Sequence, residues 1–164
     1  MCHVSCENDW KLTNGCCHQV LERYGEEAHQ LLAEEHLAPQ LLYCGRVGVL
    51  DNDPTYGELR MVIMEYVDGE TLHEVKRVPP SAKEEVARAL KFLHDKDYAF
   101  GDLRRQNVMI TRNEVKLIDF DWAGKENETR YPLLASRAIT GPLGVEGRSL
   151  IKKSHDIRMY SLLW

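Results

Sequence analysis

The sequence predicts an α+β fold in which a small sheet with one helix precedes a helical part that carries a hairpin. Three observations lead to this prediction. Residues 60–67 form a continuous apolar run typical of a strand, residues 81–94 have helical hydrophobic spacing, and residues 108–118 contain two short apolar runs around a polar turn. With 164 residues, 43% of them hydrophobic, the chain can bury one core in a single domain or in two small lobes.

The amino-terminal third is expected to contain one clear helix. Residues 1–20 show poor periodicity and several turn-forming pairs, so irregular or weakly stranded structure is predicted there. Apolar side chains recur at helical spacing over residues 26–37, and Pro39 ends this helix because the residue before a proline avoids helical geometry. A short strand at residues 41–44 and a hairpin turn within residues 49–57 are expected to follow.

The middle of the chain has the strongest patterns. Residues 60–67 (RMVIMEYV) are almost continuously apolar, which predicts burial on both faces of the strand. Ser81 and Glu84 have the spacing of a capping box at the start of the next helix. The expected core face of that helix consists of Val86, Ala89, Leu90 and Leu93. Residues 108–110 and 115–118 are expected to pair as a hairpin.

The carboxyl-terminal part has one predicted helix. Beyond Lys125 the pattern is that of a loop as far as Ile151, and the helix is expected to start near Ser154. The side chains that it is expected to bury are Met159, Leu162 and Leu163. The helical pattern stops abruptly at Trp164, which leaves open that the chain is a fragment from an incomplete gene model.

Charge and hydropathy argue against several classes of function. The 26 acidic residues outnumber the 21 basic ones, giving a formal net charge of -5, so no global field attracts nucleic acid. No apolar stretch approaches the roughly 20 residues that span a bilayer. Residues 1–7 have neither a basic start nor an apolar run, so no secretory signal is expected. The predicted location is the cytoplasm, with neither nucleic acid nor a membrane as partner.

The five cysteines do not suggest a disulfide framework, because their number is odd and Cys16 and Cys17 are adjacent. A zinc site would have to gather its ligands from Cys2, His3, Cys6, Cys16, Cys17 and His18. These residues lack the paired C-x-x-C spacing of a structural zinc site, so free thiols are the preferred interpretation.

Three side chains that carry oxygen ligands lie close together in the sequence. Asp102 is followed five positions later by Asn107, and a hairpin then delivers Asp119 at the end of an apolar strand. In phosphoryl transfer, one carboxylate accepts the proton of the attacking hydroxyl, while an Asn oxygen and a second carboxylate hold magnesium ions that bridge the nucleotide phosphates. The pattern therefore predicts Asp102 as the base and Asn107 and Asp119 as metal ligands.

This stretch resembles the protein-kinase-like superfamily. Residues 101–108 (GDLRRQNV) resemble its catalytic loop, H-R-D-L-x-x-x-N, and residues 118–122 (IDFDW) resemble its metal-binding D-F-G turn. The resemblance extends from about residue 21 to the end. It is closest to short fungal kinase-like proteins that carry R-Y-G-x-E-A-H, G-D-L-R-R-x-N and D-F-D-W-A-G motifs.

The resemblance implies further site residues. The backbone of Glu65, Tyr66 and Val67 would hold adenine at a hinge between two lobes. Glu27 would be the ion-pairing glutamate of the helix called αC, although it fits a solvated helix surface equally well. Asp156 resembles the aspartate that braces the catalytic loop, and its position is equally that of a simple helix N-cap.

Several positions depart from the family pattern. Gln19 stands where a lysine is expected, and Gly15 stands alone where a glycine-rich loop is expected. Phe100-Gly101 replaces the His-Arg of the catalytic loop, so the usual partner of an activation-loop phosphate is missing. Asp121 replaces the D-F-G glycine, as in aminoglycoside- and choline-phosphotransferase relatives, and fits either a metal-facing carboxylate or a solvated turn residue.

The resemblance implies a protein-kinase-like fold with a truncated sheet lobe and a shortened helical lobe. Its expected parts are degenerate strands at 1–20, a reduced sheet lobe at 21–70 and a carboxyl-terminal lobe at 71–164. The implied function is ATP- and Mg²⁺-dependent phosphotransfer to a hydroxyl of a protein Ser or Thr or of a small molecule. Loss of one preorganised charge-stabilising donor typically costs about 10²–10³ in rate, so the alternative is an impaired pseudokinase that binds nucleotide or acts as a scaffold.

Overall fold

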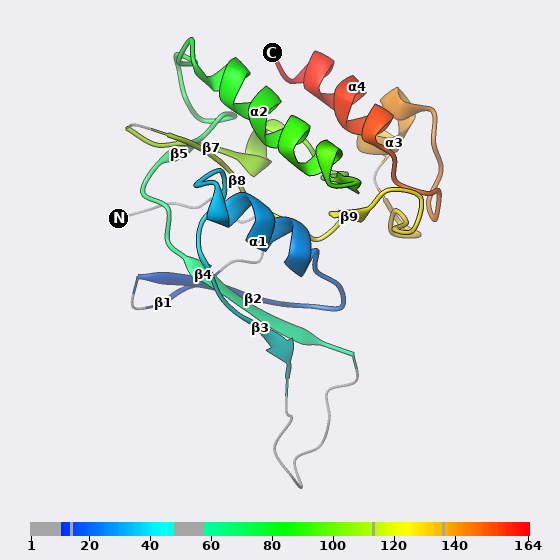
Figure 1. The fold of residues 1–164 in the computed structure, drawn as a ribbon, viewed down its shortest axis with the longest axis horizontal. Coiled ribbons are helices and arrows are strands. Elements are labelled where there is room, and N and C mark those ends of the chain that lie inside the picture. Colours follow the sequence, from blue (N-terminus) through cyan, green and yellow to red (C-terminus); the bar gives the residue numbers. More distant parts are fainter. Residues whose placement is uncertain (1–10, 14, 48–57, 113, 136) are drawn as a thin grey trace, which may run out of the picture.

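The computed structural model describes residues 11–13, 15–47, 58–112, 114–135 and 137–164. Its amino-terminal half holds a four-stranded antiparallel sheet in the order β1-β2-β4-β3. The four strands, in that order, are Lys11–Thr13, Cys16–Leu21, Arg60–Glu65 and Leu41–Arg46. Helix α1 (Glu26–Glu34) lies between this sheet and helix α2 (Ala82–Asp95), as Figure 1 shows.

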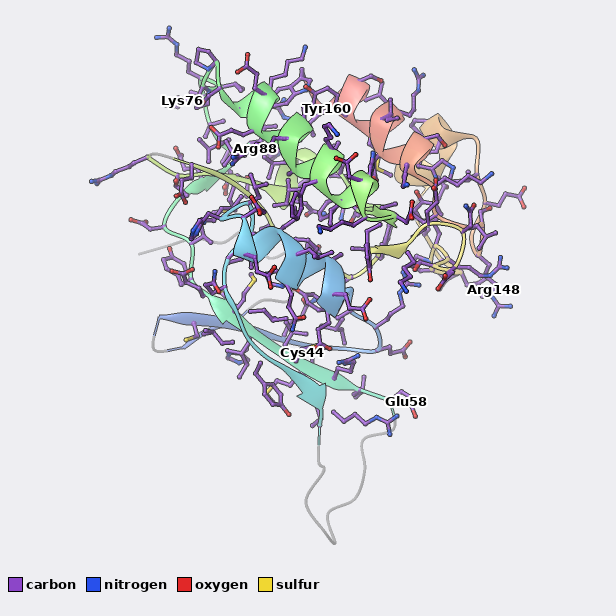
Figure 2. The ribbon with its side chains drawn as sticks, viewed as in Figure 1. Cys44, Glu58, Lys76, Arg88, Arg148 and Tyr160 are labelled. Atoms are coloured by element: carbon purple, nitrogen blue, oxygen red, sulfur yellow. The ribbon has the colours of Figure 1, made fainter. Side chains whose placement is uncertain are left out.

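The carboxyl-terminal half is mainly helical and carries two small sheets. Strands β5 (Glu70–Thr71), β7 (Val108–Ile110) and β8 (Val115–Leu117) form one sheet, and β6 (Tyr98–Ala99) pairs with β9 (Gly124–Lys125). A short 3₁₀ turn, η1 (Arg105–Asn107), directly precedes β7. The remaining helices are α3 (Arg137–Leu143) and α4 (Lys153–Leu163). Helix α4 lies beside α2 (Figure 1), and Tyr160, labelled in Figure 2, donates a hydrogen bond of 3.0 Å to the Lys83 carbonyl.

One hydrophobic core joins the two halves. Its buried side chains come from β2, α1 and β4 on the sheet side and from α2, β7, β8 and α4 on the helical side. Leu32 of α1, Val62 of β4 and Leu93 of α2 are each completely buried in it. Since burial of such a side chain contributes roughly 1.5–3 kcal/mol, the shared core fixes the two halves relative to one another, and with them the residues that each half brings to the site.

Several sequence-based predictions are confirmed. Helix α2 follows Ser81 and buries all four predicted core residues, and β7 pairs with β8 as the predicted hairpin. The helix predicted at 26–37 is α1, which ends three residues early. It ends there because His36 adopts a left-handed backbone (φ 60°) and the Leu37 N–H turns back to the Leu32 carbonyl at 2.8 Å.

Strands β2 and β4 differ from what the sequence predicted. Residues 16–21 form a regular strand, because all six residues pair with β4 along its full length. Local sequence does not show this pairing, because the partner residues lie 39 to 49 positions further along the chain. Strand β4 buries Val62 and Met64 but leaves the intervening residues partly exposed, so the strand is buried on one face only.

Three expectations for the helical half are also wrong. The capping box does not form, because Ser81 itself has helical backbone angles (φ -69°, ψ -23°) and its side chain makes no cap hydrogen bond. Helix α3 occupies part of the predicted loop. Leu162 is 53% exposed, because it lies at the edge of the α4 face that buries Met159 and Leu163.

Some expectations concern residues outside the described part of the chain. The predicted turn at 49–57 lies outside the described residues, and so do three of the candidate zinc ligands, Cys2, His3 and Cys6. Within the ranges that the structure describes, Cys16, Cys17 and Cys44 form no disulfide bond. Among the described residues, no helix combines the length and the hydropathy that crossing a membrane requires.

Candidate active site

The loop that precedes η1 is held in place by a buried carboxylate of α4. Asp156 is completely buried and accepts hydrogen bonds from the backbone N–H groups of Phe100 and Gly101, both at 2.8 Å. A ring nitrogen of His94 contacts the same carboxylate at 2.9 Å. Gly101 has a φ of 81°, a conformation that glycine adopts without strain. Asp156 therefore braces the loop, which decides between the two roles that the sequence left open.

Asp102 and Asn107 contact each other across this loop. Asp102 is 3% exposed and Asn107 is completely buried. The Asn107 side-chain nitrogen donates to the Asp102 carbonyl at 2.9 Å and to Asp102 Oδ2 at 3.1 Å. Asn107 Oδ1 is buried and has no hydrogen-bond partner, whereas buried polar atoms are nearly always paired. The amide is thus fixed through its nitrogen, and its oxygen is left available for a cation.

Arg104 forms a two-pronged ion pair with Asp102. Its Nε lies 2.6 Å from Asp102 Oδ1, and its second guanidinium nitrogen lies 2.7 Å from Oδ2. Such paired hydrogen bonds are strong and directional. Burial raises the pKa of Asp102, while Arg104 and Asn107 act in the opposite direction. This contact was not predicted from the sequence, although an arginine two positions after the proposed base was a visible signal.

Asp119 lies at the same site, immediately after the hairpin. It is 8% exposed and has a φ of 66°, which is rare for any residue other than glycine. The Ile118 N–H donates to the Asn107 carbonyl at 3.0 Å, so the end of the hairpin is tied directly to the preceding loop. Burial and the nearby Asp102 carboxylate raise the pKa of Asp119 to about 6. The structure therefore brings together the three residues that the sequence selected.

Asp121 belongs to the same group of acids. Its carboxyl is hydrogen-bonded to that of Asp119, and its Oδ1 is buried without a partner. Burial and the Asp119 carboxylate raise the pKa of Asp121 to about 8. Asp121 is therefore not a solvated turn residue. Two adjacent acids in this environment retain a proton near neutral pH when no cation is present.

The composition of this group fits a magnesium ion that is shared with a nucleotide. Within the described ranges, no three His, Cys, Asp or Glu side chains form a complete metal site by themselves. Mg²⁺ usually takes one or two protein carboxylates together with substrate phosphates and water. Asp119, with the unpaired oxygens of Asn107 and Asp121, matches that kind of partial site.

On the sheet side of the site, position 19 carries no positive charge. Gln19 lies opposite Val62 in the β2–β4 pairing, on the same strand face as the buried residues Cys17 and Leu21. Its Oε1 atom is buried and unpaired. A neutral amide thus occupies the position at which the family pattern has a lysine.

The structure does not support Glu27 as the ion-pairing glutamate. Glu27 is exposed, and its carboxylate accepts a hydrogen bond from the Tyr98 hydroxyl of β6. Glu26 instead pairs with Arg60 of β4, with 2.7 Å between the two side chains. Successive residues of a helix point about 100° apart, so only one of these neighbours can face the sheet, and that residue is Glu26.

Glu65, Tyr66 and Val67 connect the four-stranded sheet to β5. The Glu65 N–H donates to the Gln40 carbonyl at 2.9 Å, and the Tyr66 N–H donates to the Gly15 carbonyl at 3.2 Å. These hydrogen bonds fix the start of the connection against the sheet. Its role in holding adenine stays a prediction.

A cavity of about 680 Å³ lies at a different place, beside the amino-terminal end of α1. It is lined by the start of α1, Arg60, Tyr98 and parts of residues 123–130. Asp102, Asn107 and Asp119 are not among its lining residues. The buried acids and the unpaired amide oxygen, rather than the volume of this cavity, therefore locate the candidate active site.

Comparison with known proteins gives a consistent result. Residues 47–142 match the family described as the protein kinase domain. The chain is 29% identical over 128 residues to a probable serine/threonine-protein kinase of Streptomyces coelicolor, covering 73% of this chain and 18% of that protein. It is 28% identical over 64 residues to the lipopolysaccharide core heptose(II) kinase of Escherichia coli, covering 39% of this chain and 28% of that protein.

Among solved structures, the Cydia pomonella granulovirus kinase PK-1 superimposes with a TM-score of 0.61 at 13% sequence identity. The match covers 90% of this chain and 59% of the viral kinase, and it shows that the two share a fold. The predicted kinase-like fold is thus confirmed. The chain spans less than a fifth of the length of the Streptomyces coelicolor relative.

Proposed function

Because the chain belongs to the protein kinase domain family, we propose that it is an ATP- and Mg²⁺-dependent phosphotransferase domain. The observation that carries this proposal is Asn107 Oδ1, a buried and unpaired oxygen beside Asp102 and the Asp119–Asp121 pair. Asn107 and Asp119 would hold Mg²⁺, with Asp121 as a neighbouring oxygen donor. Bound there, the ion would neutralise charge on the nucleotide phosphates during transfer.

In this proposal, Asp102 would accept the proton of the acceptor hydroxyl. During transfer, a bond forms between the hydroxyl oxygen and the terminal phosphorus, the bond from that phosphorus to the ADP oxygen breaks, and the hydroxyl proton passes to Asp102. Arg104 favours the ionised form of Asp102, which a base requires. A carboxylate has about four lone-pair directions, so Asp102 can accept this proton while Arg104 remains bound.

We assign the adenine site to the backbone of Glu65, Tyr66 and Val67, which joins the sheet to the helical half. Gln19 contributes an amide rather than a positive charge to the phosphate side. Turnover is therefore expected to be slower than with a lysine at this position.

The acceptor is a hydroxyl group of a protein Ser or Thr or of a small molecule. A serine/threonine kinase and a heptose kinase are both among the similar proteins, and an aspartate base suits either hydroxyl. The cytoplasmic location and the closeness to short fungal kinase-like proteins stay predictions.

The test is a phosphotransfer assay of the purified protein with ATP, Mg²⁺, a mixture of Ser- and Thr-containing peptides, and a panel of sugars. Asp102→Asn is expected to slow transfer by about 10²–10⁴, the range of general-base catalysis. Equal rates in the two proteins would contradict the role of Asp102. Stabilisation by Mg-ATP without transfer would instead support the nucleotide-binding alternative.

A further inference from the structure

Residues 23–25, which connect β2 to α1, contact the chain just after Asp119. The Arg23 guanidinium donates hydrogen bonds to three backbone carbonyls, those of Asp121 at 3.3 Å, Trp122 at 3.2 Å and Arg130 at 2.5 Å. These acceptors lie about 100 residues further along the sequence, and two of them, Asp121 and Trp122, belong to the proposed metal-binding turn. One side chain thus holds both the turn and the later part of the same segment.

Gly25 contacts the same segment through its backbone. Its N–H donates to the Phe120 carbonyl at 2.9 Å. A Cβ atom at this position would lie only 2.5 Å from the Ala123 carbonyl oxygen and 2.8 Å from the Ala123 side chain. Since the closest atom belongs to the backbone, it cannot be moved without shifting the segment, and only glycine allows this approach.

Aromatic stacking completes the contact. The His29 ring of α1 is completely buried and stacks on the Phe120 ring, with centroids 4.5 Å apart and planes 3° from parallel. Tyr24 fixes this ring through a 2.7 Å hydrogen bond to His29 Nδ1, and the Pro39 carbonyl lies 2.7 Å from Nε2. Residues 120–123 are therefore held in three ways. Arg23 and Gly25 bind their backbone carbonyls, His29 stacks on the Phe120 ring, and the Gly25 backbone lies close to Ala123.

We propose that residues 23–25 form a clasp that positions the metal-binding turn, with Arg23 as its positioning residue. The carbonyls of residues 120, 121 and 122 are each held by the clasp, so the backbone next to Asp119 is fixed by the connection between β2 and α1. The acceptors on the segment are backbone carbonyls, which need no covalent modification. The clasp therefore orders residues 119–130 without a phosphate on that segment. Its effect on Mg²⁺ affinity rests on the proposed function, whereas its effect on local order does not.

The experiment compares Arg23→Ala and Arg23→Lys with the native chain. Arg46→Ala is the matched control, because Arg46 is an exposed arginine that pairs only with the exposed Glu58 in the described residues. The first measurement is hydrogen exchange of peptides that cover residues 119–131, without ligand. Arg23→Ala is expected to exchange there about tenfold faster, because lost hydrogen bonds lower the free energy of local opening, while Arg46→Ala is expected to match the native chain.

The second measurement is the Mg²⁺ concentration that gives half of the maximal thermal stabilisation by ATP. Arg23→Ala is expected to raise it about tenfold, as loss of residues that orient metal ligands typically does, and Arg23→Lys is expected to fall between the two. Unchanged exchange in residues 119–131, or faster exchange spread evenly over the whole protein, would overturn the clasp. Faster local exchange in a chain whose native form shows no Mg-ATP stabilisation would support the clasp and contradict the proposed function.

Discussion

The two sides of the proposed active site retain different parts of its chemistry. On the helical side, Asp102, Asn107 and Asp119 are all buried, a hydrogen bond joins Asn107 to Asp102, and the Asn107 amide oxygen is left available. On the sheet side, Gln19 supplies no charge. The positive charge of Arg60 is already paired with Glu26. The proton acceptor and the metal ligands are thus kept, while the cation that would contact the phosphates is not.

This difference indicates where the reaction would be limited. A buried acid near an arginine can serve as a base without help from the sheet. Phosphates, by contrast, need positive charge, and here Mg²⁺ would have to supply most of it. The chain is therefore expected to depend strongly on its metal ligands and to gain from a new cation on the sheet side.

The largest effect is expected from Asp119→Asn. Without this carboxylate, Mg²⁺ binds poorly, so the stabilisation by Mg-ATP should disappear. At 100 times the dissociation constant that stabilisation amounts to about 2.7 kcal/mol, or roughly 5–10 °C in melting temperature for a chain of this size. Thermal melts with ATP, in Mg²⁺ and in EDTA, measure it. Glu114→Gln, which changes an exposed acid in the preceding turn, is the control, and a full Mg²⁺-dependent shift in Asp119→Asn would contradict the assignment.

The next effect is a gain from Gln19→Lys. A lysine at this position would place a positive charge where the Gln19 oxygen is now buried and unpaired, so turnover is expected to rise about tenfold or more. Gln19→Met is the matched variant, since it keeps a long side chain without charge. Steady-state phosphotransfer rates decide the question. Equal rates for Gln19→Lys and Gln19→Met would show that missing charge is not what distinguishes the two sides.

The sequence predicted the helical side of the site well because its parts are local. Asp102 and Asn107 share one loop, and a single hairpin leads to Asp119, so spacing alone brings the three together. Asp156 could be placed only as one of two alternatives, since its partners lie more than 50 residues away.

The sheet side could not be predicted in the same way. Strand β2 (CCHQVL) has no alternating pattern, and it is ordered by its pairing with β4. The choice between Glu26 and Glu27 depends on how α1 is rotated against Arg60, which neighbouring residues of one helix do not reveal. The contacts of Arg23 with residues 121–130 depend on the whole fold. Long-range contacts of this kind leave no periodic signal in a single sequence.

A smaller effect is expected in stability against pH. The pKa of Asp121 rises from its usual 3.8 to about 8 in the folded chain, mainly through burial and Asp119. Folding therefore favours the protonated form, and stability is lost as pH rises from about 4 towards 8. Asp121→Asn, measured in EDTA, is expected to melt about 5 °C higher than the native chain at pH 8, with the difference vanishing near pH 4. Mg²⁺ should reduce this difference by favouring the ionised pair.

The buried His29 also changes stability with pH, but it does not affect the comparison of Asp121→Asn with the native chain. Burial lowers its pKa to about 4, so folding favours neutral His29 and stability is lost as pH falls from 6.5 towards 4. Both proteins contain His29, and its contribution cancels in the difference between their melting temperatures. A difference that stays constant from pH 4 to pH 8 would mean that Asp121 does not titrate with its neighbour.

The smallest effect is expected from Glu27→Gln. Its side chain is exposed and contacts Tyr98 rather than a cation, so turnover should change less than about twofold, as is typical of exposed polar contacts. Glu26→Gln should lower the melting temperature more, because it breaks a partly buried ion pair with Arg60. Melting temperatures and initial rates of the two variants test this order. A loss of turnover in Glu27→Gln as large as that of Asp119→Asn would contradict this order and would assign Glu27 to the active site.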